Sequence, residues 1–414
     1  MKKLIKNNLI LFCLPFLPVF FFLVGFIVNE DLSTGGAEWD FYLTWPIIMG
    51  YSNFNFSTNL TTHMPLHYMM LSSINAIFNN QYVVRLIYYF FSFFLPLFLY
   101  LNLKQIYKQN KTLLIIFSSS FLLIPFFRAT AIWPNSHLTA IIFLLIGNYY
   151  YLKAKETNKF KYKIANLLFL SFSIYCIQTY LILFLYYLYN YLIFEKINNF
   201  IKLFLFSTLL SIPGFLFILL NPRTISVGNF ITHDIFYTIS SNFSLIFFFL
   251  LFLILNQKNL TIVLDKIKSL NKKEIIIIVF LVFIVFYYQQ NFALDARLRG
   301  GGFFYKLSYL IFKNNLIFII SFLLGMIISY ILIKCEKKFF YILLIMNMMS
   351  INFIVYQKYF EPLFLILMSI LFKNFLINNI LSNLKNTLTF YALIMLYFLI
   401  ACINNFGRIT LPIA

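Results

Sequence analysis

The chain has 414 residues, of which 62% are hydrophobic and 11% are charged, and its net charge is +20. No soluble core could bury so much apolar surface, so the composition excludes an ordinary soluble protein. The basic residues lie in short loops between apolar runs, a pattern that indicates contact with anionic membrane lipids and predicts no nucleic-acid partner.

Apolar runs of about 20 residues predict membrane-spanning helices. We therefore predict an all-α, polytopic integral membrane protein with about 11 to 13 transmembrane helices, forming a single domain over residues 1–414. The first run shows no signal-peptide cleavage site and is expected to remain as a helix. The predicted spans lie near 8–28, 83–103, 112–127, 135–152, 164–177, 178–194, 203–220, 242–256, 275–289, 314–333, 339–356, 360–380 and 387–404.

Lysine residues set the predicted topology, because loops on the cytoplasmic side of a membrane are enriched in lysine and arginine. Lys2, Lys3 and Lys6 place the N-terminus in the cytoplasm. The loops on both sides of the short pair 164–194 contain lysine, so this pair must form a tight or broken hairpin. We expect the protein in the inner (plasma) membrane of a bacterium.

The predicted outer loops differ from the inner ones, because they hold seven of the twelve acidic residues and the arginines lie on or near them. A guanidinium group binds phosphate through a bidentate fork, which suits a phosphorylated lipid substrate. Pairing between surface charges would give the same distribution. The acids are Glu30, Asp31, Glu38, Asp40, Asp234, Asp295 and Glu361, and the arginines are Arg85, Arg128, Arg223, Arg297, Arg299 and Arg408.

The first outer loop, about 29–82, is the longest, and a loop of this length is usually functional. Its aromatic stretch DFYLTWPIIMGYSNF predicts an amphipathic helix on the membrane surface. Asp40 stands directly before this stretch and could cap the helix. Glu38 and Asp40 are two residues apart, so they would not share a helix face.

His63 and His67, further along this loop, are four residues apart and could bind zinc from one helix face. Pro65 lies between them, and no carboxylate stands in the pattern of a zinc protease. We therefore predict no metal site and interpret the two histidines as polar lining of a substrate cavity. The four cysteines show no metal-binding spacing either.

The segment THMPLHYMMLS (62–72), after an acidic motif and an aromatic helix, resembles the HxPLxYxxL segment of the GT-C glycosyltransferases. Further segments resemble the α-1,2-glucosyltransferases that use dolichyl-phosphoglucose, in the same order along nearly the whole chain. These segments are CIQTYLILFLYY (176–187), SVGNFITHD (226–234), FALDARLRGGGFFYKLSYLIF (292–312) and YQKYFEPLFLI (356–366). Ile177 replaces the arginine of the family, and Asn229 replaces its acid.

The resemblance implies a hexosyltransferase, of the inverting kind, that acts on the non-cytoplasmic face. Its partners would be a polyprenyl-phosphate sugar donor and a lipid-linked or cell-envelope glycan acceptor, and no cofactor beyond the donor is expected. Such a transfer needs a carboxylate base, for which the candidates are Glu38 and Asp40. An ungapped match to the family motif favours Glu38, but the residues themselves leave both open.

Cations must hold the phosphate as it leaves, and three glycines beside Arg297 and Arg299 would let backbone N–H groups approach it closely. A flexible outer loop with arginines on lipid headgroups is the alternative. The full set of candidate substrate- and phosphate-binding residues is Arg297, Arg299, Lys306, Asp295, His233, Lys358, His63, His67 and Gln178.

Two other classes share this apolar profile. A lipid-linked oligosaccharide flippase or polysaccharide transporter would show internal repeats and ionisable residues near the middle of the membrane, and the sequence shows neither clearly. An O-antigen-type polymerase would place its large loop late in the chain, whereas the large loop here follows the first span.

Overall fold

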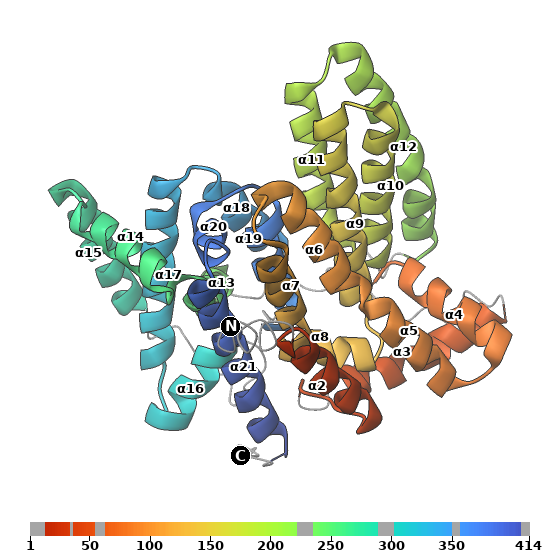
Figure 1. Cartoon of the computed structure of the whole chain (residues 1–414), viewed down its shortest axis with the longest axis horizontal. Coiled ribbons are helices and arrows are strands. Elements are labelled where there is room, and N and C mark those ends of the chain that lie inside the picture. Colours follow the sequence, from red (N-terminus) through yellow and green to blue (C-terminus); the bar gives the residue numbers. More distant parts are fainter. Residues whose placement is uncertain are drawn as a thin grey trace, which may run out of the picture. The chain divides into compact units, whose positions relative to one another are not determined.

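The computed structural model describes residues 13–33, 36–53, 63–221, 235–288, 302–349 and 357–406 (Figure 1). Within these ranges the chain forms α-helices and short 3-10 turns, without a β-strand. Four described helices are long and apolar enough to cross a membrane, or five if a bent pair counts as one span. The coarse prediction of an α-helical membrane protein is therefore confirmed, while the number of spans and their orientation stay predictions.

The described candidate spans agree in position with predicted ones. They are Gln81–Tyr107, which contains α5 (Gln81–Ser92) and α6 (Phe94–Tyr107), then Ile197–Leu220 (α12), Leu316–Cys335 (α17) and Leu384–Asn405, within α21 (Leu384–Phe406). The bent pair joins Lys111–Leu123 to Pro125–Ile132 at an angle of 67°. The break falls before Pro125, because a proline offers no backbone N–H to continue the preceding helix.

The chain divides into two compact units, which are described separately. The first unit contains residues 1–228 and 397–405, and the second contains residues 229–396 and 406–414. Besides the helices already named, the first unit contains α2 (Phe16–Ile27), α3 (Gly36–Ser52), α4 (Leu66–Phe78), α7 (Lys111–Ser120), α8 (Pro125–Ile132), α9 (Ser136–Thr157), α10 (Phe160–Cys176) and α11 (Leu181–Phe194).

Helices α10 and α11 form the hairpin that the lysines predict. They are separated by the 3-10 turn Gln178–Tyr180. Lys163, in the first turn of α10, lies 2.6 Å from the carboxylate of Glu195, which follows the end of α11. An ion pair between the start of one helix and the end of the next requires the two helices to run antiparallel. The structure therefore has an antiparallel helix pair where the hairpin is predicted, while its crossing of the membrane stays a prediction.

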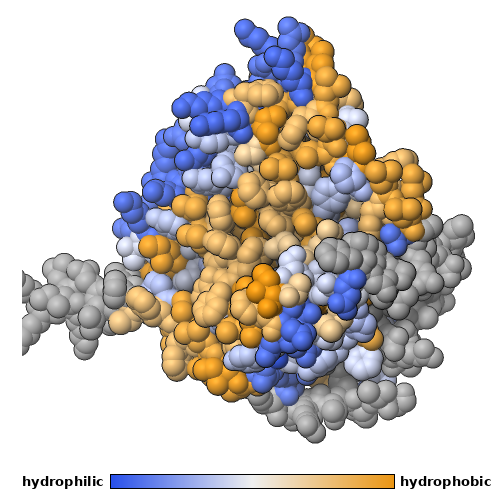
Figure 2. Space-filling model, turned by 90° about the vertical axis from the view of Figure 1, so that its right-hand side faces the viewer, coloured by the Kyte–Doolittle hydropathy of each residue, from blue (hydrophilic) through white to orange (hydrophobic). Residues whose placement is uncertain are grey.

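In the first unit, Glu30, Asp31, Glu38 and Asp40 lie at the end opposite the lysine cluster 153–163. Helix α9 begins with Ser136 next to the histidines described below and ends near Lys155 after 22 residues, a length of about 33 Å. We call the end with residues 153–163 the lysine end, and the end with residues 28–42 the acid end. On the face that carries α4 and α12, hydrophilic side chains lie at the top and down the left edge, and a second hydrophilic group lies below the centre, with hydrophobic side chains between the two (Figure 2).

Buried polar side chains link the helices of the first unit to one another. Asn148 donates to the amide oxygen of Asn102 at 2.8 Å, and Asn102 donates to the carbonyl oxygen of Leu145 at 2.9 Å. The hydroxyl group of Tyr187 also donates to Asn148, at 2.6 Å. Hydrogen bonds of this kind hold helices together in an apolar environment, where burial of hydrophobic surface cannot.

Helix α12 is continuous and contains Pro213, beside which a side chain from α10 enters its hydrogen-bond ladder. The hydroxyl group of Tyr175 accepts from the N–H group of Gly214 at 3.1 Å and donates to the carbonyl oxygen of Leu210. A Cβ atom at position 214 would lie 2.7 Å from the Tyr175 ring, so glycine permits the contact. Insertion of a side chain into the ladder is a known cause of helix kinks.

The second unit consists of α13 to α20 and the first part of α21. Helices α13 (Ile235–Ile254) and α17 approach each other closely, because a Cβ atom on Gly325 would lie 2.1 Å from the carbonyl oxygen of Phe243. Ser244 and Ser321 join the two helices through a hydrogen bond of 2.6 Å. The remaining elements are α14 (Gln257–Lys268), α15 (Lys272–Tyr288), α16 (Gly302–Phe312), α18 (Phe339–Met349), Gln357–Tyr359, α19 (Leu363–Ile370) and α20 (Phe375–Ile380).

Candidate functional site

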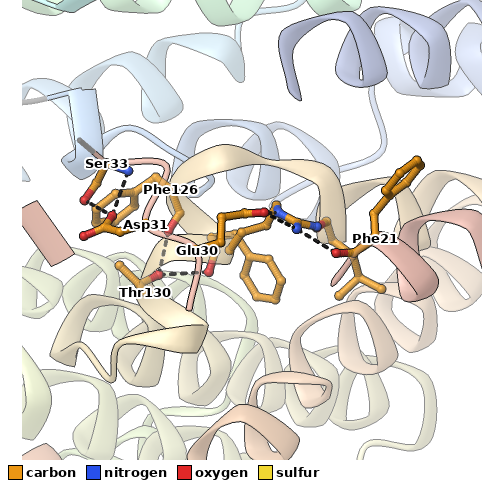
Figure 3. Close-up of polar contacts among 9 residues, drawn as sticks. Phe21, Glu30, Asp31, Ser33, Phe126 and Thr130 are labelled. Atoms are coloured by element: carbon orange, nitrogen blue, oxygen red, sulfur yellow. Dashed lines mark hydrogen bonds and ion pairs between the residues drawn. The ribbon is translucent and has the colours of Figure 1, made fainter. Parts of the chain in front are cut away.

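The candidate base residues lie on α3, whose N-terminus is fixed by Asp31 and Ser33. The carboxylate of Asp31 accepts from the N–H group of Glu38 at 2.8 Å, and the hydroxyl oxygen of Ser33 accepts from Ala37 at 2.7 Å. Asp31 also accepts from the N–H group of Ser33 at 2.8 Å (Figure 3). These acceptors satisfy backbone groups that have no partner inside a helix.

The cap formed by Asp31 shows that Asp40 does not cap α3, which was one role that the sequence suggested for it. The sequence suggested that Asp40 caps the surface helix, but α3 begins at Gly36, so Asp40 lies within the helix. The capping carboxylate belongs to Asp31 instead. Asp40 is thus not needed for capping, and its role as a candidate base stays a prediction.

Helix α3 presents one buried and one exposed face. Ala37, Phe41 and Ile48 are buried, whereas Trp39 and Leu43 are 66% and 58% exposed. An exposed face rich in aromatic side chains suits a membrane–water interface, where such rings are enriched. The helix is confirmed, but apolar residues lie on both of its faces, so the predicted amphipathic character is not seen. Its position on the membrane surface stays a prediction.

Glu38 and Asp40 are both half-buried and lie at opposite borders between the two faces of α3. At 100° per residue in an α-helix, two positions are about 200° apart, so the carboxylates point in different directions. The expectation that they do not share a face is confirmed by the helix. Each carboxylate can therefore face a different neighbour.

Arg128 and Glu30 form a buried ion pair at the acid end. The Nε and Nη2 atoms of Arg128 lie 2.7 and 2.8 Å from the two carboxylate oxygens of Glu30, in a bidentate arrangement. Arg128 also donates to the carbonyl oxygens of Phe21 at 2.8 Å and Leu122 at 3.3 Å. Figure 3 shows Glu30 and Phe21 on either side of the guanidinium group.

Neighbouring residues pack tightly against the Arg128–Glu30 ion pair. A Cβ atom on Gly25 would lie 2.5 Å from Nη2 of Arg128 and 3.0 Å from Glu30, so only glycine leaves room for the pair against α2. The ring of Phe398, from the part of α21 in the first unit, lies 4.6 Å from the guanidinium carbon of Arg128. Sequence reasoning grouped Arg128 with possible phosphate-binding arginines, but its charge is neutralised within the fold.

Arg85, near the start of α5, has different partners. Its Nε atom donates to the carbonyl oxygen of Ile132 at 3.1 Å, and its Nη2 atom donates to the amide oxygen of Asn29 at 2.8 Å. The guanidinium carbon lies 3.6 Å from the ring centroid of Trp133, a cation–π contact. Glu38 and Tyr42, one turn apart on α3, act on Arg85 electrostatically.

His67 is buried in a polar cluster between α4, α5 and α9. Its Nδ1 atom lies 2.8 Å from the hydroxyl group of Thr139, which is 3.0 Å from the hydroxyl group of Tyr88. Tyr88 also donates to the carbonyl oxygen of Asn135 at 2.8 Å. Burial, with a smaller effect from His63, lowers the pKa of His67 from 6.5 to about 3, so the ring is neutral at physiological pH.

His63 and His67 do not share a helix, because α4 begins at Leu66, after Pro65. His63 instead packs edge-on against His137, with ring centroids 5.7 Å apart. Sequence reasoning missed His137, since nothing near it in the chain links it to the first loop. Within the described ranges, no group of three or more His, Cys, Asp or Glu side chains could hold a metal ion.

Gln178 lies at the turn of the α10–α11 hairpin, as predicted. Cys176, two residues earlier, contacts the backbone of His67. The hairpin turn therefore meets α4 at the acid end, which brings Gln178 to the same end of the first unit as the histidines. Its role in sugar binding stays a prediction.

The other predicted binding residues are placed differently. Lys306 is exposed on α16 and Lys358 is half-buried in the turn Gln357–Tyr359, both in the second unit. Asp295, Arg297, Arg299 and His233 lie outside the described residues. The predicted phosphate site at Arg297 and Arg299 is thus untested.

Comparisons with known proteins assign the chain to no family. No protein-family model matches the chain, and neither a curated protein nor a solved structure matches it. The resemblance to GT-C glycosyltransferases therefore rests on the sequence segments alone.

The buried ion pair generates a prediction about stability. Replacing Glu30 by Gln leaves the buried charge of Arg128 without a counter-charge, which should cost about 3–5 kcal/mol of unfolding free energy. The midpoint of thermal unfolding in detergent measures the loss. Glu156→Gln makes the same chemical change at an exposed position of the lysine end and should leave the midpoint unchanged. Equal midpoints for Glu30→Gln and the wild type would contradict the assigned role.

His67 generates a prediction about pH. As pH falls below 6.5, the unfolded histidine gains a proton that the folded one does not accept until about pH 3, so stability declines through this window. His67→Gln, which can keep a hydrogen bond to Thr139, should show a smaller drop in unfolding midpoint between about pH 7 and about pH 4. His137→Gln, at a half-buried histidine, serves as the control. An equal drop in wild type and His67→Gln would show that His67 is not the titrating group.

Proposed function

We propose that the protein transfers a hexose from a polyprenyl-phosphate donor to a lipid-linked or cell-envelope glycan acceptor on the non-cytoplasmic face of the membrane. The observation that supports this most is the placement of two half-buried carboxylates, Glu38 and Asp40, on a helix that follows the first described apolar helix. They lie at the end of the first unit opposite the lysines, and Arg85 lies beside Glu38.

In the proposed reaction, one carboxylate takes the proton of an acceptor hydroxyl group while the acceptor oxygen attacks carbon C1 of the hexose. The bond from C1 to the phosphate oxygen breaks, and its electron pair leaves with the polyprenyl phosphate. Attack opposite the leaving group inverts the anomeric carbon. The donor's own phosphate is the leaving group, so the step balances without a further co-reactant.

Two kinds of residue would lower the barrier to this reaction. A positioned base contributes about 10²- to 10⁴-fold. Fixed cations near the leaving phosphate stabilise the charge that develops there, and such preorganised charge is usually the larger contribution. Among the described arginines of the first unit, Arg85 is the candidate for this cation, because Arg128 is already bound to Glu30.

The location of buried ionisable residues favours an enzyme over a transporter. A transporter would need such residues near the middle of the membrane. In the described part of the first unit, the buried acidic, basic and histidine side chains lie at its two ends. Lys163 is at the lysine end, and Glu30, Asp31, His67, Arg85 and Arg128 are at the acid end.

The two candidate bases can be separated by single variants. Glu38→Gln and Asp40→Asn each remove one carboxylate from α3 without touching its cap, so both should fold. Transfer of labelled hexose from a polyprenyl-phosphohexose by the purified protein should fall about 10²- to 10⁴-fold for one of them. Glu156→Gln is the matched control and should keep full activity. Unchanged transfer in both α3 variants would refute the proposed base.

A further inference from the structure

Two consecutive residues at the acid end hold two different arginines. Asn29 accepts a hydrogen bond from Arg85 at 2.8 Å, and Glu30 accepts two from Arg128 at 2.7 and 2.8 Å. The two arginines therefore sit in neighbouring positions with unlike partners. Arg128 meets a carboxylate, whereas Arg85 meets a neutral amide.

Among the residues that the structure describes, none neutralises the charge of Arg85 by a close contact. Arg128 pairs with Glu30 and Lys163 pairs with Glu195, but Arg85 forms no ion pair with a described residue. Glu38 acts on Arg85 only from beyond the distance of an ion pair. Yet Arg85 is only 7% exposed. A buried charge without a counter-ion is costly, so an anion that binds it would be strongly favoured.

Arg85 also has hydrogen-bond donors to spare. A guanidinium group carries five N–H donors. The hydrogen bonds of Arg85 use Nε and one hydrogen of Nη2, which leaves both hydrogens of Nη1 and one of Nη2. Two adjacent terminal nitrogens with free hydrogens form the fork that binds phosphate in a bidentate manner. The stacked ring of Trp133 and the carbonyl group of Ile132 keep this fork in a fixed position.

Two residues that act on the guanidinium group are themselves exposed. Asn29, which holds its Nη2 atom, is exposed, and Tyr42 on α3 is 49% exposed. Arg85 lies in the second turn of the candidate span Gln81–Tyr107, which is the depth of lipid phosphates if this helix crosses the membrane. The anionic groups that a membrane offers at this depth are the phosphate esters of its lipids.

We propose that Arg85 is the anchor of an anion-binding site for the phosphate group of a membrane lipid. Glu38 borders this site, so the phosphate of a sugar-bearing lipid would lie near one candidate base. Binding at Arg85 does not require that the protein transfers sugar, because the site is defined by the unneutralised guanidinium group. If the proposed function is correct, Arg85 holds the donor phosphate as it leaves.

Asn29→Asp is the most informative variant. It keeps the shape of the side chain and its hydrogen bond to Arg85, but it supplies the carboxylate that Arg85 lacks. Aspartate also tolerates the left-handed backbone of position 29, where φ is 51°. The variant should therefore fold at least as well as the wild type and bind phosphate about 10- to 100-fold more weakly.

Two further variants should change phosphate binding in opposite directions. Arg85→Gln removes the guanidinium group and should abolish binding, although loss of its contacts to Ile132 and Asn29 can impair folding. Glu38→Gln removes a nearby negative charge without touching Arg85, so it should bind phosphate roughly threefold more tightly. The opposite signs for Asn29→Asp and Glu38→Gln keep the test decisive even if Arg85→Gln does not fold.

The experiment measures the unfolding midpoint of the purified full chain in detergent as a function of added ligand, because a ligand that binds only the folded state raises it. The probes are inorganic phosphate, a polyprenyl phosphate and phosphatidylglycerol, with the matching polyprenol as the phosphate-free control. If only polyprenyl phosphate raises the unfolding midpoint, and Asn29→Asp loses this rise, the site is supported and its ligand is a polyprenyl phosphate. If phosphatidylglycerol or inorganic phosphate raises the midpoint, and the same variant loses this rise, the site is supported and that probe is identified as its ligand.

The proposal is overturned if no phosphate probe raises the midpoint, or if the shift is the same in Asn29→Asp and in the wild type. It is also overturned if the polyprenol acts as strongly as its phosphate. Binding that depends on Arg85 in a protein that transfers no hexose would reject the proposed function and keep the anion site. If the protein transfers hexose but Asn29→Asp does not change phosphate binding, the anion site is rejected and the proposed function is kept.

Discussion

The buried ion pair between Glu30 and Arg128 is the interaction on which the acid end of the first unit depends. It ties the loop after α2 to α8, across 98 positions in sequence, and Phe398 of α21 packs against the guanidinium group. Burial removes both charges from water, which is favourable only when the geometry is close to ideal and the remaining donors are satisfied. The bidentate contact and the carbonyl groups of Phe21 and Leu122 meet that requirement.

This pair also positions its neighbours in the chain. With Glu30 held by Arg128, Asn29 is placed against Arg85 and Asp31 is placed at the N-terminus of α3. Three consecutive residues thus fix an arginine with an unneutralised charge, a buried ion pair, and the helix that carries Glu38 and Asp40. A small loop thereby determines where a cation and two carboxylates lie relative to one another, and the proposed chemistry needs that relation.

Structural features that depend on residues close together in the chain, or on the distribution of lysines between loops, could be predicted from the sequence. The α10–α11 hairpin followed from lysines on both of its flanks, and the helix that carries Glu38 followed from the aromatic stretch after the first span. Long-range pairing could not be predicted, because no local pattern links Arg128 to Glu30 or His137 to His63. The sequence offered a cap at Asp40 as an alternative to its role as a base, since an aspartate before an aromatic run is a local signal. The structure instead supplies the cap from Asp31, seven positions before Glu38.

The most direct test of the account is a structure of the protein in a lipid nanodisc with a non-transferable polyprenyl-phosphonate hexose, determined by electron cryo-microscopy. The account predicts the phosphonate within hydrogen-bonding distance of the Arg85 guanidinium group, with C1 of the hexose between it and a carboxylate of α3. A phosphonate bound at the lysine end, or at the acid end without contact to Arg85, would contradict the account.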